Sequence, residues 1–212
     1  YQIDLADGRR VVLKVAPAPG VRVMRYEHGI LGSEVQVLRL VREHTNVPVP
    51  EVYFHDDSLT VIDSPYFLMS FVAGKAYHQV RDSFTPQRRA IVEQTTGTYL
   101  HQINAIPGPY FGYPALASRG YRSWRQAFLA MFEELLQDGL EKYVGLPVEY
   151  ATLRRQVEAA APALDDVRTP QLVHWDLWDG NIFVDPKTGL ISGLIDFERA
   201  LWGDPLMEFQ YR

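Results

Sequence analysis

Apolar and polar residues alternate in two short stretches near the N-terminus, 1–5 and 10–15, which flank an Asp-Gly pair. A period of two is typical of a strand that is buried on one face, and Asp-Gly is a favoured hairpin turn. The pattern therefore predicts a β-hairpin. Two further strands are predicted at 51–55 and 66–71, because Pro, Ser and Asp residues that favour turns bound both stretches.

A different pattern, with apolar residues every three or four positions, predicts helices in four later segments. One begins near Glu34, after a Pro-, Gly- and Arg-rich segment at 16–31 that is predicted to be a loop. The others are predicted to follow Thr85, Ser123 and residue 148. Thr85 precedes a proline and Ser123 precedes a glutamine by three positions, and both arrangements are typical of helix starts.

The stretch 172–198 combines short apolar runs with polar residues at their ends. Asp176 follows the apolar run 171–173, on a loop where a carboxylate can face a cleft and serve as a base or orient a hydroxyl. Asn181 precedes the apolar run 182–184. The Pro- and Gly-containing segment 185–189 then predicts a turn into a returning strand that ends before Asp196.

Folding this hairpin brings Asn181 and Asp196 to the same open end, within a residue or two of register. Magnesium is usually bound in proteins by one or two oxygen ligands together with substrate phosphates. An Asn/Asp pair beside a second carboxylate, Asp176, is therefore a candidate site for a metal-bound nucleotide.

Composition narrows the class of protein. The 212 residues are 47% hydrophobic and 22% charged, as in ordinary globular proteins. Cysteine is absent, and neither a signal-like start nor an apolar run long enough to cross a bilayer is found, so a cytoplasmic location away from membranes is expected. A formal charge of −5 argues against nucleic acid as the main partner and is compatible with a cationic substrate.

Three motifs carry a resemblance to a known family: His174 to Asn181 (HWDLWDGN), Ile195 to Glu198 (IDFE) and Gly203 to Pro205 (GDP). Together they resemble the aminoglycoside phosphotransferase and choline kinase-like family. The resemblance implies an α+β, two-lobed protein kinase-like fold, with an antiparallel nucleotide-binding lobe at 1–72 and a mainly helical lobe at 73–212. It also implies a further strand before Tyr1 and further helices after Arg212.

The same resemblance implies roles for residues of the first lobe. Lys14 would hold the nucleotide phosphates, and Glu34 would pair with it. The segment 67–74 resembles the hinge between kinase lobes. There Met69 would lie behind the adenine, while the Ser70 carbonyl and the Val72 amide would bond to the base.

Residues of the second lobe also receive roles from the family. Phe183 and Ile195 would form the floor of the adenine pocket. Asp204 and Glu208 are predicted to cap and brace the catalytic loop. The apolar stripe of the helix at 124–140 is predicted to be core, with some of it lining a substrate cleft, and His101 is predicted to be a buried structural histidine.

The resulting hypothesis is an ATP-dependent phosphotransferase, with GTP as the other candidate donor and Mg²⁺ held by Asn181 and Asp196. Asp176 would accept the proton of a small-molecule hydroxyl. The acceptor would be an aminoglycoside-like antibiotic or an amino-alcohol or sugar metabolite. The alternative is a nucleotide-binding pseudokinase or sensor that does not transfer phosphate. The motifs of serine hydrolases and zinc proteases, G-x-S-x-G and H-E-x-x-H, are absent from the sequence.

Overall fold

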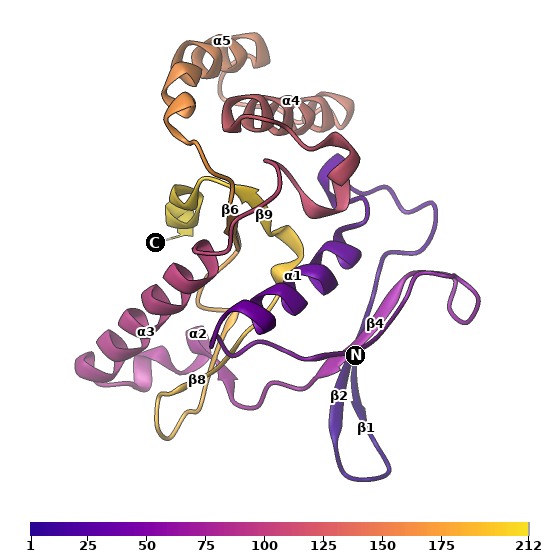
Figure 1. Cartoon of the computed structure of the whole chain (residues 1–212), viewed down its shortest axis with the longest axis vertical. Coiled ribbons are helices and arrows are strands. Elements are labelled where there is room, and N and C mark those ends of the chain that lie inside the picture. The colour runs from indigo at the N-terminus through magenta and orange to yellow at the C-terminus, as the bar shows by residue number, and fades with distance from the viewer. Residues whose placement is uncertain (212) are drawn as a thin grey trace.

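The computed structural model describes residues 1–211, without the side chains of residues 117–119, 210 and 211. Arg212, with which the predicted second lobe ends, lies outside the described residues. Strands and helices are both present, and every sheet pairing is antiparallel, as the α+β prediction requires. Figure 1 shows the β1–β2 hairpin at one end of the molecule and helices α4 and α5 at the other.

Four strands form the N-terminal sheet, in the order β1, β2, β4, β3. Their bounds are β1 (Gln2–Asp4), β2 (Arg10–Val15), β3 (Val52–Asp56) and β4 (Tyr66–Ser70). The predicted hairpin and both later strands are thus confirmed. The register of β2 against β4 sets Lys14 opposite Phe67, a residue with no solvent exposure. The lysine therefore leaves the sheet beside the molecular core.

Helix α1 (Ile30–His44) packs against strand β3 of this sheet and against the short helix η5 (Phe197–Arg199). It begins four residues earlier than Glu34, where the sequence pattern places its start. Gly29, its N-cap, has φ 75° and so adopts the left-handed conformation that glycine tolerates. Because of the earlier start, Glu34 lies in the second turn, and only 1% of it is exposed.

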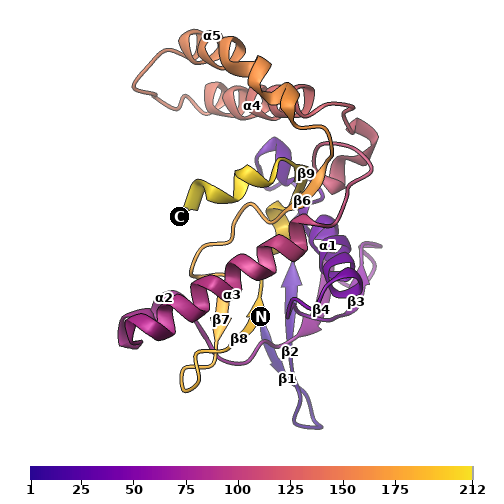
Figure 2. The same ribbon diagram turned by 60° about the vertical axis from the view of Figure 1, so that its left-hand side comes forward.

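Four further α-helices follow the N-terminal sheet along the chain: α2 (Tyr77–Val80), α3 (Pro86–Asn104), α4 (Trp124–Glu141) and α5 (Tyr150–Ala160). The predicted starts of α3 and α4 are confirmed. The Thr85 and Ser123 side chains accept hydrogen bonds from the backbone N–H groups of Arg88 (3.2 Å) and Gln126 (3.3 Å). Figure 2 shows α4 and α5 packed together above the C-terminal segment.

One face of α3 is buried. It consists of Val92, Thr96, Leu100 and Ile103, whereas Ile91 is 56% exposed. His101 is also exposed, so its interpretation as a buried structural histidine is wrong. Consecutive helical residues lie about 100° apart around the axis, which places His101 beside the face that Leu100 buries and not within it.

Five short strands complete the fold, and they position the stretch 172–198. Strands β5 (Lys75–Ala76), β7 (Ile182–Val184) and β8 (Ile191–Leu194) form one sheet, and β6 (Gln171–Val173) pairs with β9 (Leu201–Gly203). The predicted turn between β7 and β8 is present. The Asp185 side chain accepts hydrogen bonds there from the N–H groups of Lys187 (2.7 Å) and Thr188 (3.0 Å).

The remaining helical turns are short: η1 (Arg25–Glu27), η2 (Arg81–Ser83), η3 (Pro114–Arg119), η4 (Ala161–Asp166) and η6 (Pro205–Tyr211). Among the described residues, 1–211, none of the helices has the length and apolar character that a membrane crossing demands.

Candidate active site

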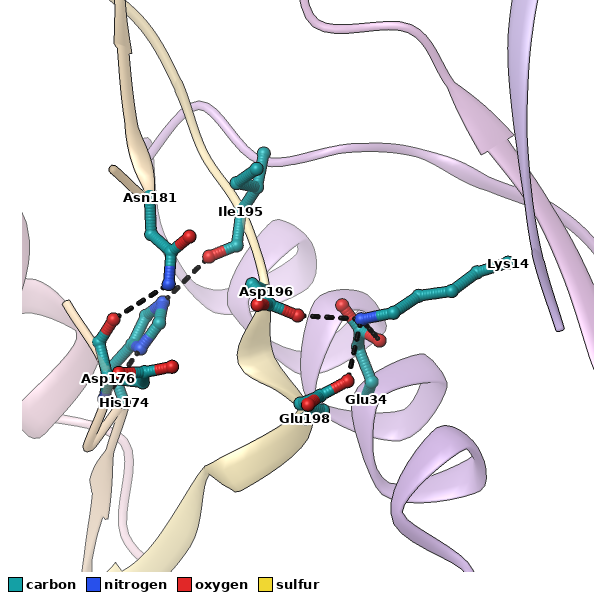
Figure 3. A network of polar contacts seen from close by, with 8 residues as sticks. All are labelled: Lys14, Glu34, His174, Asp176, Asn181, Ile195, Asp196 and Glu198. Atoms are coloured by element: carbon teal, nitrogen blue, oxygen red, sulfur yellow. Dashed lines mark hydrogen bonds and ion pairs between the residues drawn. The ribbon is translucent and has the colours of Figure 1, made fainter. Parts of the chain in front are cut away.

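Lys14 lies at the centre of a cluster of three carboxylates. Its Nζ is 2.6 Å from Glu34 Oε2, 2.6 Å from Asp196 Oδ1 and 2.9 Å from Glu198 Oε2. The three partners come from α1 and from the segment after β8, so residues distant in sequence converge on one ammonium (Figure 3). The pairing of Lys14 with Glu34 that the resemblance implies is present, and Asp196 and Glu198 join it.

The charges of this cluster depend on one another. Burial works to lower the pKa of Lys14, but the carboxylates of Glu34, Asp196 and Glu198 outweigh it and raise that pKa. Burial raises the pKa of Glu34 to about 7, and the Lys14 ammonium opposes this rise. Lys14 is therefore a permanent cation, and its charge limits the cost of an ionised Glu34 in the interior.

The loop after β6 carries Asp176, and a buried histidine shapes this loop. The backbone N–H of Asp176 donates to His174 Nδ1 (3.3 Å), which leaves Nε2 as the protonated nitrogen that donates to the Ile195 carbonyl (3.0 Å). Burial lowers the pKa of His174 to about 4. The ring is therefore neutral near pH 7 and links the Asp176 loop to the end of β8.

One acidic residue near the C-terminus braces the same loop, and another caps a helix. Glu208, which is buried, accepts hydrogen bonds from the backbone N–H groups of His174 (2.7 Å) and Trp175 (3.3 Å). The Asp204 side chain accepts from the N–H of Leu206 (3.0 Å) at the start of η6. The predicted brace is thus present for Glu208, whereas the bond of Asp204 caps η6.

The β7–β8 hairpin brings Asn181 and Asp196 together at its open end. The pairing of Ile182 with Leu194 continues into a hydrogen bond from Ile195 N–H to the Asn181 carbonyl (3.0 Å). Asn181 Nδ2 donates to the Asp176 carbonyl (2.8 Å), so its Oδ1 faces away from that carbonyl. Figure 3 shows Asp176 and Asn181 side by side, with Asp196 between them and Lys14.

Two residues of the site have left-handed backbone conformations. Trp175 has φ 59° and Asp196 has φ 67°. Asp tolerates this region, but for a bulky side chain it is an outlier that costs about 1–3 kcal/mol. The surrounding hydrogen bonds to Glu208 hold Trp175 in this conformation.

The segment with the predicted hinge connects β4 to β5. Gly74 has φ 113°, and a Cβ there would lie 2.4 Å from the Val184 carbonyl oxygen, so the turn requires glycine. Val72 packs on Gly193 of β8, and Met69 packs against the main core. Phe183, on β7, pairs with Gly193. Their predicted contacts with adenine remain predictions.

Two residues near the site were not expected from the sequence. Glu198 contributes to the Lys14 cluster, and its position two residues after Asp196 was the available signal. The second is Tyr26, which lies inside the predicted loop at 16–31. It stacks on Tyr113 (ring centroids 5.8 Å apart) and contacts Trp175 edge-on (6.5 Å). Nothing in the sequence pattern of that loop distinguishes Tyr26 from its neighbours.

The family model described as "Phosphotransferase enzyme family" matches residues 1–211. The chain belongs to this phosphotransferase family. The match confirms the family resemblance that the motifs carry.

Solved structures similar to this family member are aminoglycoside phosphotransferases. A thermostable mutant of aminoglycoside phosphotransferase APH(4)-Ia has a TM-score of 0.66 at 22% identity, over 98% of this chain and 65% of that one. A ternary complex of the same enzyme with AMP-PNP and hygromycin B has a TM-score of 0.66 at 21% identity, over 98% and 64%. These likenesses confirm the expected fold.

Two curated relatives carry different names. "Probable acyl-CoA dehydrogenase IBR3" from Arabidopsis thaliana is 28% identical, over all of this chain and 26% of its own length. "Acyl-CoA dehydrogenase family member 10" from Mus musculus is 22% identical, over all of this chain and 19% of its own length. The phosphotransferase-family chain thus spans about a quarter or less of these relatives.

Proposed function

We propose that the chain is the phosphotransferase part of an enzyme that moves the γ-phosphate of ATP to a hydroxyl group of a small molecule. The observation that carries this proposal is the convergence of Lys14, Asp196 and Asn181 beside Asp176 (Figure 3). Phosphoryl transfer depends on positioning and on charge stabilisation, and these residues supply both.

Residues 1–72 are proposed as the nucleotide-binding lobe and residues 73–212 as the helical lobe. The pairing of Lys75 and Ala76 with β7 supports a boundary directly after Val72, because the chain there leaves the N-terminal sheet. Met69, Ser70 and Val72 would contact the adenine from this connection.

Further nucleotide contacts are proposed beneath the adenine ring and at the phosphates. Phe183 and Ile195 would lie beneath the adenine ring. Lys14, oriented by Glu34, would neutralise charge on the phosphates. ATP is proposed as the donor, with GTP as the competing one.

The donor atoms near Asp196 fit a divalent cation. The Lys14 ammonium lies among the carboxylates of Glu34, Asp196 and Glu198, and it contacts Asp196 through Oδ1, so Oδ2 is the Asp196 oxygen proposed as a ligand. Asn181, held through its Nδ2, leaves its Oδ1 as an oxygen ligand. Hard oxygen ligands of this kind suit Mg²⁺, for which Asn181 and Asp196 are the proposed residues. When bound, Mg²⁺ would neutralise charge on the phosphate oxygens.

Asp176 is proposed to orient the acceptor hydroxyl and to accept its proton as the O–P bond forms and ADP leaves. His174 is proposed as a positioning residue, because it is neutral, buried and bonded to the Asp176 loop. The acceptor class named for structural relatives, aminoglycosides such as hygromycin B, is one candidate, and amino-alcohol or sugar metabolites are others.

The test is release of ADP by the complete protein with Mg-ATP and a panel of aminoglycosides, amino alcohols and sugars, with GTP compared. An Asp176→Asn variant is expected to lose about 10²–10⁴-fold in kcat while it still binds Mg-ATP. Retention of most of the wild-type turnover would contradict the assignment of Asp176. Tight binding of Mg-ATP without ADP formation on any acceptor would favour the pseudokinase or sensor instead.

A further inference from the structure

A cavity of about 180 Å³ lies between η1, α4 and the loop that carries Asp176. Most of its lining is apolar or aromatic. The main contributors are Tyr26, Tyr113, Phe128, Met131, Phe132 and Trp175. The apolar stripe of α4 is therefore not entirely core, since part of it faces this cavity.

The cavity adjoins the proposed site of transfer. Trp175, one of its walls, directly precedes Asp176, and its ring lies 6.2 Å from that of Tyr113 and 6.5 Å from that of Tyr26. A molecule in the cavity thus lies beside the loop that carries Asp176.

The acidic side chains of α4 do not make this cavity a site for amines. Arg25 pairs with both Asp138 and Glu141, and Arg154 pairs with Glu133 at 2.7 Å. Glu134, the remaining acidic residue of this fully described helix, is not free either. A polycationic sugar would need uncompensated carboxylates, whereas α4 offers apolar surface and three carboxylates that are paired with arginines.

The volume sets the size of the group that fits. An apolar cavity of about 150 Å³ accepts a benzene-sized molecule, so this cavity accommodates one ring or a branched chain of about six carbons. Apolar side chains lining a pocket and a few polar groups at its edge are typical of small-molecule sites.

We infer that this cavity binds the body of the acceptor, and that the acceptor is an alcohol with an aromatic or branched aliphatic body. The inference rests on the proposed phosphotransferase function and narrows its acceptor class. The hydroxyl would extend past Trp175 toward Asp176 while the apolar body stays between α4 and Tyr26.

The test compares 2-phenylethanol and 3-methylbutan-1-ol with ethanolamine, glycerol and kanamycin in ADP release by the complete protein. All five offer a primary hydroxyl, so they differ in the body that carries it. We expect kcat/KM for the apolar alcohols to exceed that for the others by at least about tenfold, as burial of a ring-sized apolar group predicts.

A cavity-filling substitution tests whether the alcohol binds in this cavity. Leu135 lines the cavity and is 51% exposed, so the larger side chain of Leu135→Trp can reduce the cavity volume without crowding the core. Leu140→Trp is the matched control, because Leu140 is 40% exposed on the same helix and does not line the cavity. Leu135→Trp is expected to raise KM for 2-phenylethanol by about tenfold or more, and Leu140→Trp to leave it within about twofold.

Binding of 2-phenylethanol is also measured directly, by saturation-transfer NMR without nucleotide, and circular dichroism checks the fold of both variants. ADP formation that does not favour the apolar alcohols, or equal binding by both variants, overturns the inference and leaves the phosphotransferase function standing. Binding that Leu135→Trp abolishes, without ADP formation on any alcohol, keeps the cavity as an apolar site and overturns the phosphotransferase function. If the protein neither binds 2-phenylethanol nor forms ADP with any alcohol, both the inference and the phosphotransferase function are overturned.

Discussion

The Lys14 ammonium and the Glu34 carboxylate lie 2.6 Å apart, and the Glu34 side chain is only 1% exposed. Such a carboxylate is stable in the interior only while its counter-charge remains. This relationship joins β2 to α1 and so links the two elements on which the proposed nucleotide site depends.

Replacing Lys14 by Met is therefore expected to lower the free energy of unfolding by about 3 kcal/mol at pH 8. Burial already raises the pKa of Glu34 to about 7 beside the ammonium, and removal of the ammonium raises it further above its unfolded value. The folded state then binds more protons than the unfolded state, so the unfolding free energy decreases as pH rises from about 5 to the folded pKa. Urea denaturation between pH 5 and 8 measures this slope. The Lys14→Met/Glu34→Gln double variant should lose it, and an unchanged slope would contradict the coupling.

His174 is expected to stay neutral in the folded protein until pH falls to about 4. Its unfolded pKa is near 6.5, so between these values the unfolded state binds more protons and the unfolding free energy falls as pH is lowered. The loss attributable to this residue approaches about 3 kcal/mol below pH 4. NMR titration of the His174 ring, assigned by its absence in a His174→Asn variant, tests the prediction. A midpoint near 6.5 in the folded protein would refute it.

Glu208 is expected to be a positioning residue whose loss affects both stability and transfer. Glu208→Ala leaves the N–H groups of His174 and Trp175 without their acceptor, at a cost of about 2–3 kcal/mol, and Glu208→Gln should cost less because one carbonyl oxygen remains. Chemical denaturation gives the stability, and kcat at saturating ATP gives the effect on the Asp176 loop. Asp165→Ala, which breaks an exposed ion pair with Arg125, is the control and should cost less than about 1 kcal/mol.

Arg25 is expected to hold the segment 16–29 against α4. Its side chain pairs with Asp138 and Glu141, and its backbone N–H donates to Asp138 (2.9 Å). Arg25→Gln should speed amide exchange in this segment while changing global stability by less than about 1 kcal/mol, because the ion pairs are partly exposed. Hydrogen exchange read by mass spectrometry distinguishes this result from uniform exchange. Arg154→Gln, which breaks another ion pair of α4, should leave the segment unchanged.

Much of the fold and the site could be predicted because the signals are local. The cap at Thr85, the turn at 185–189 and the convergence of Asn181 and Asp196 each depend on residues that are close in sequence. These local structures follow from the hydrogen bonds that neighbouring residues can make.

Other features could not be predicted, because they depend on contacts between segments that are distant in sequence. The partial burial of Tyr26 depends on Tyr113 and Trp175, which come much later in the chain, and no local pattern in the loop contains that information. His101 was misjudged for a related reason. Leu100 and His101 are equally compatible with a helix, and only the packing of α3 against β6 decides which of them is buried.

The left-handed backbone at Trp175 has a consequence for how this protein can change. Glycine at 175 would relieve the conformational cost, but it would also remove one wall of the cavity beside Asp176. Selection for thermal stability alone would favour that exchange, whereas selection for a particular acceptor would resist it. If the cavity binds the acceptor as proposed, position 175 is thus a point at which stability can be exchanged for a different range of substrates.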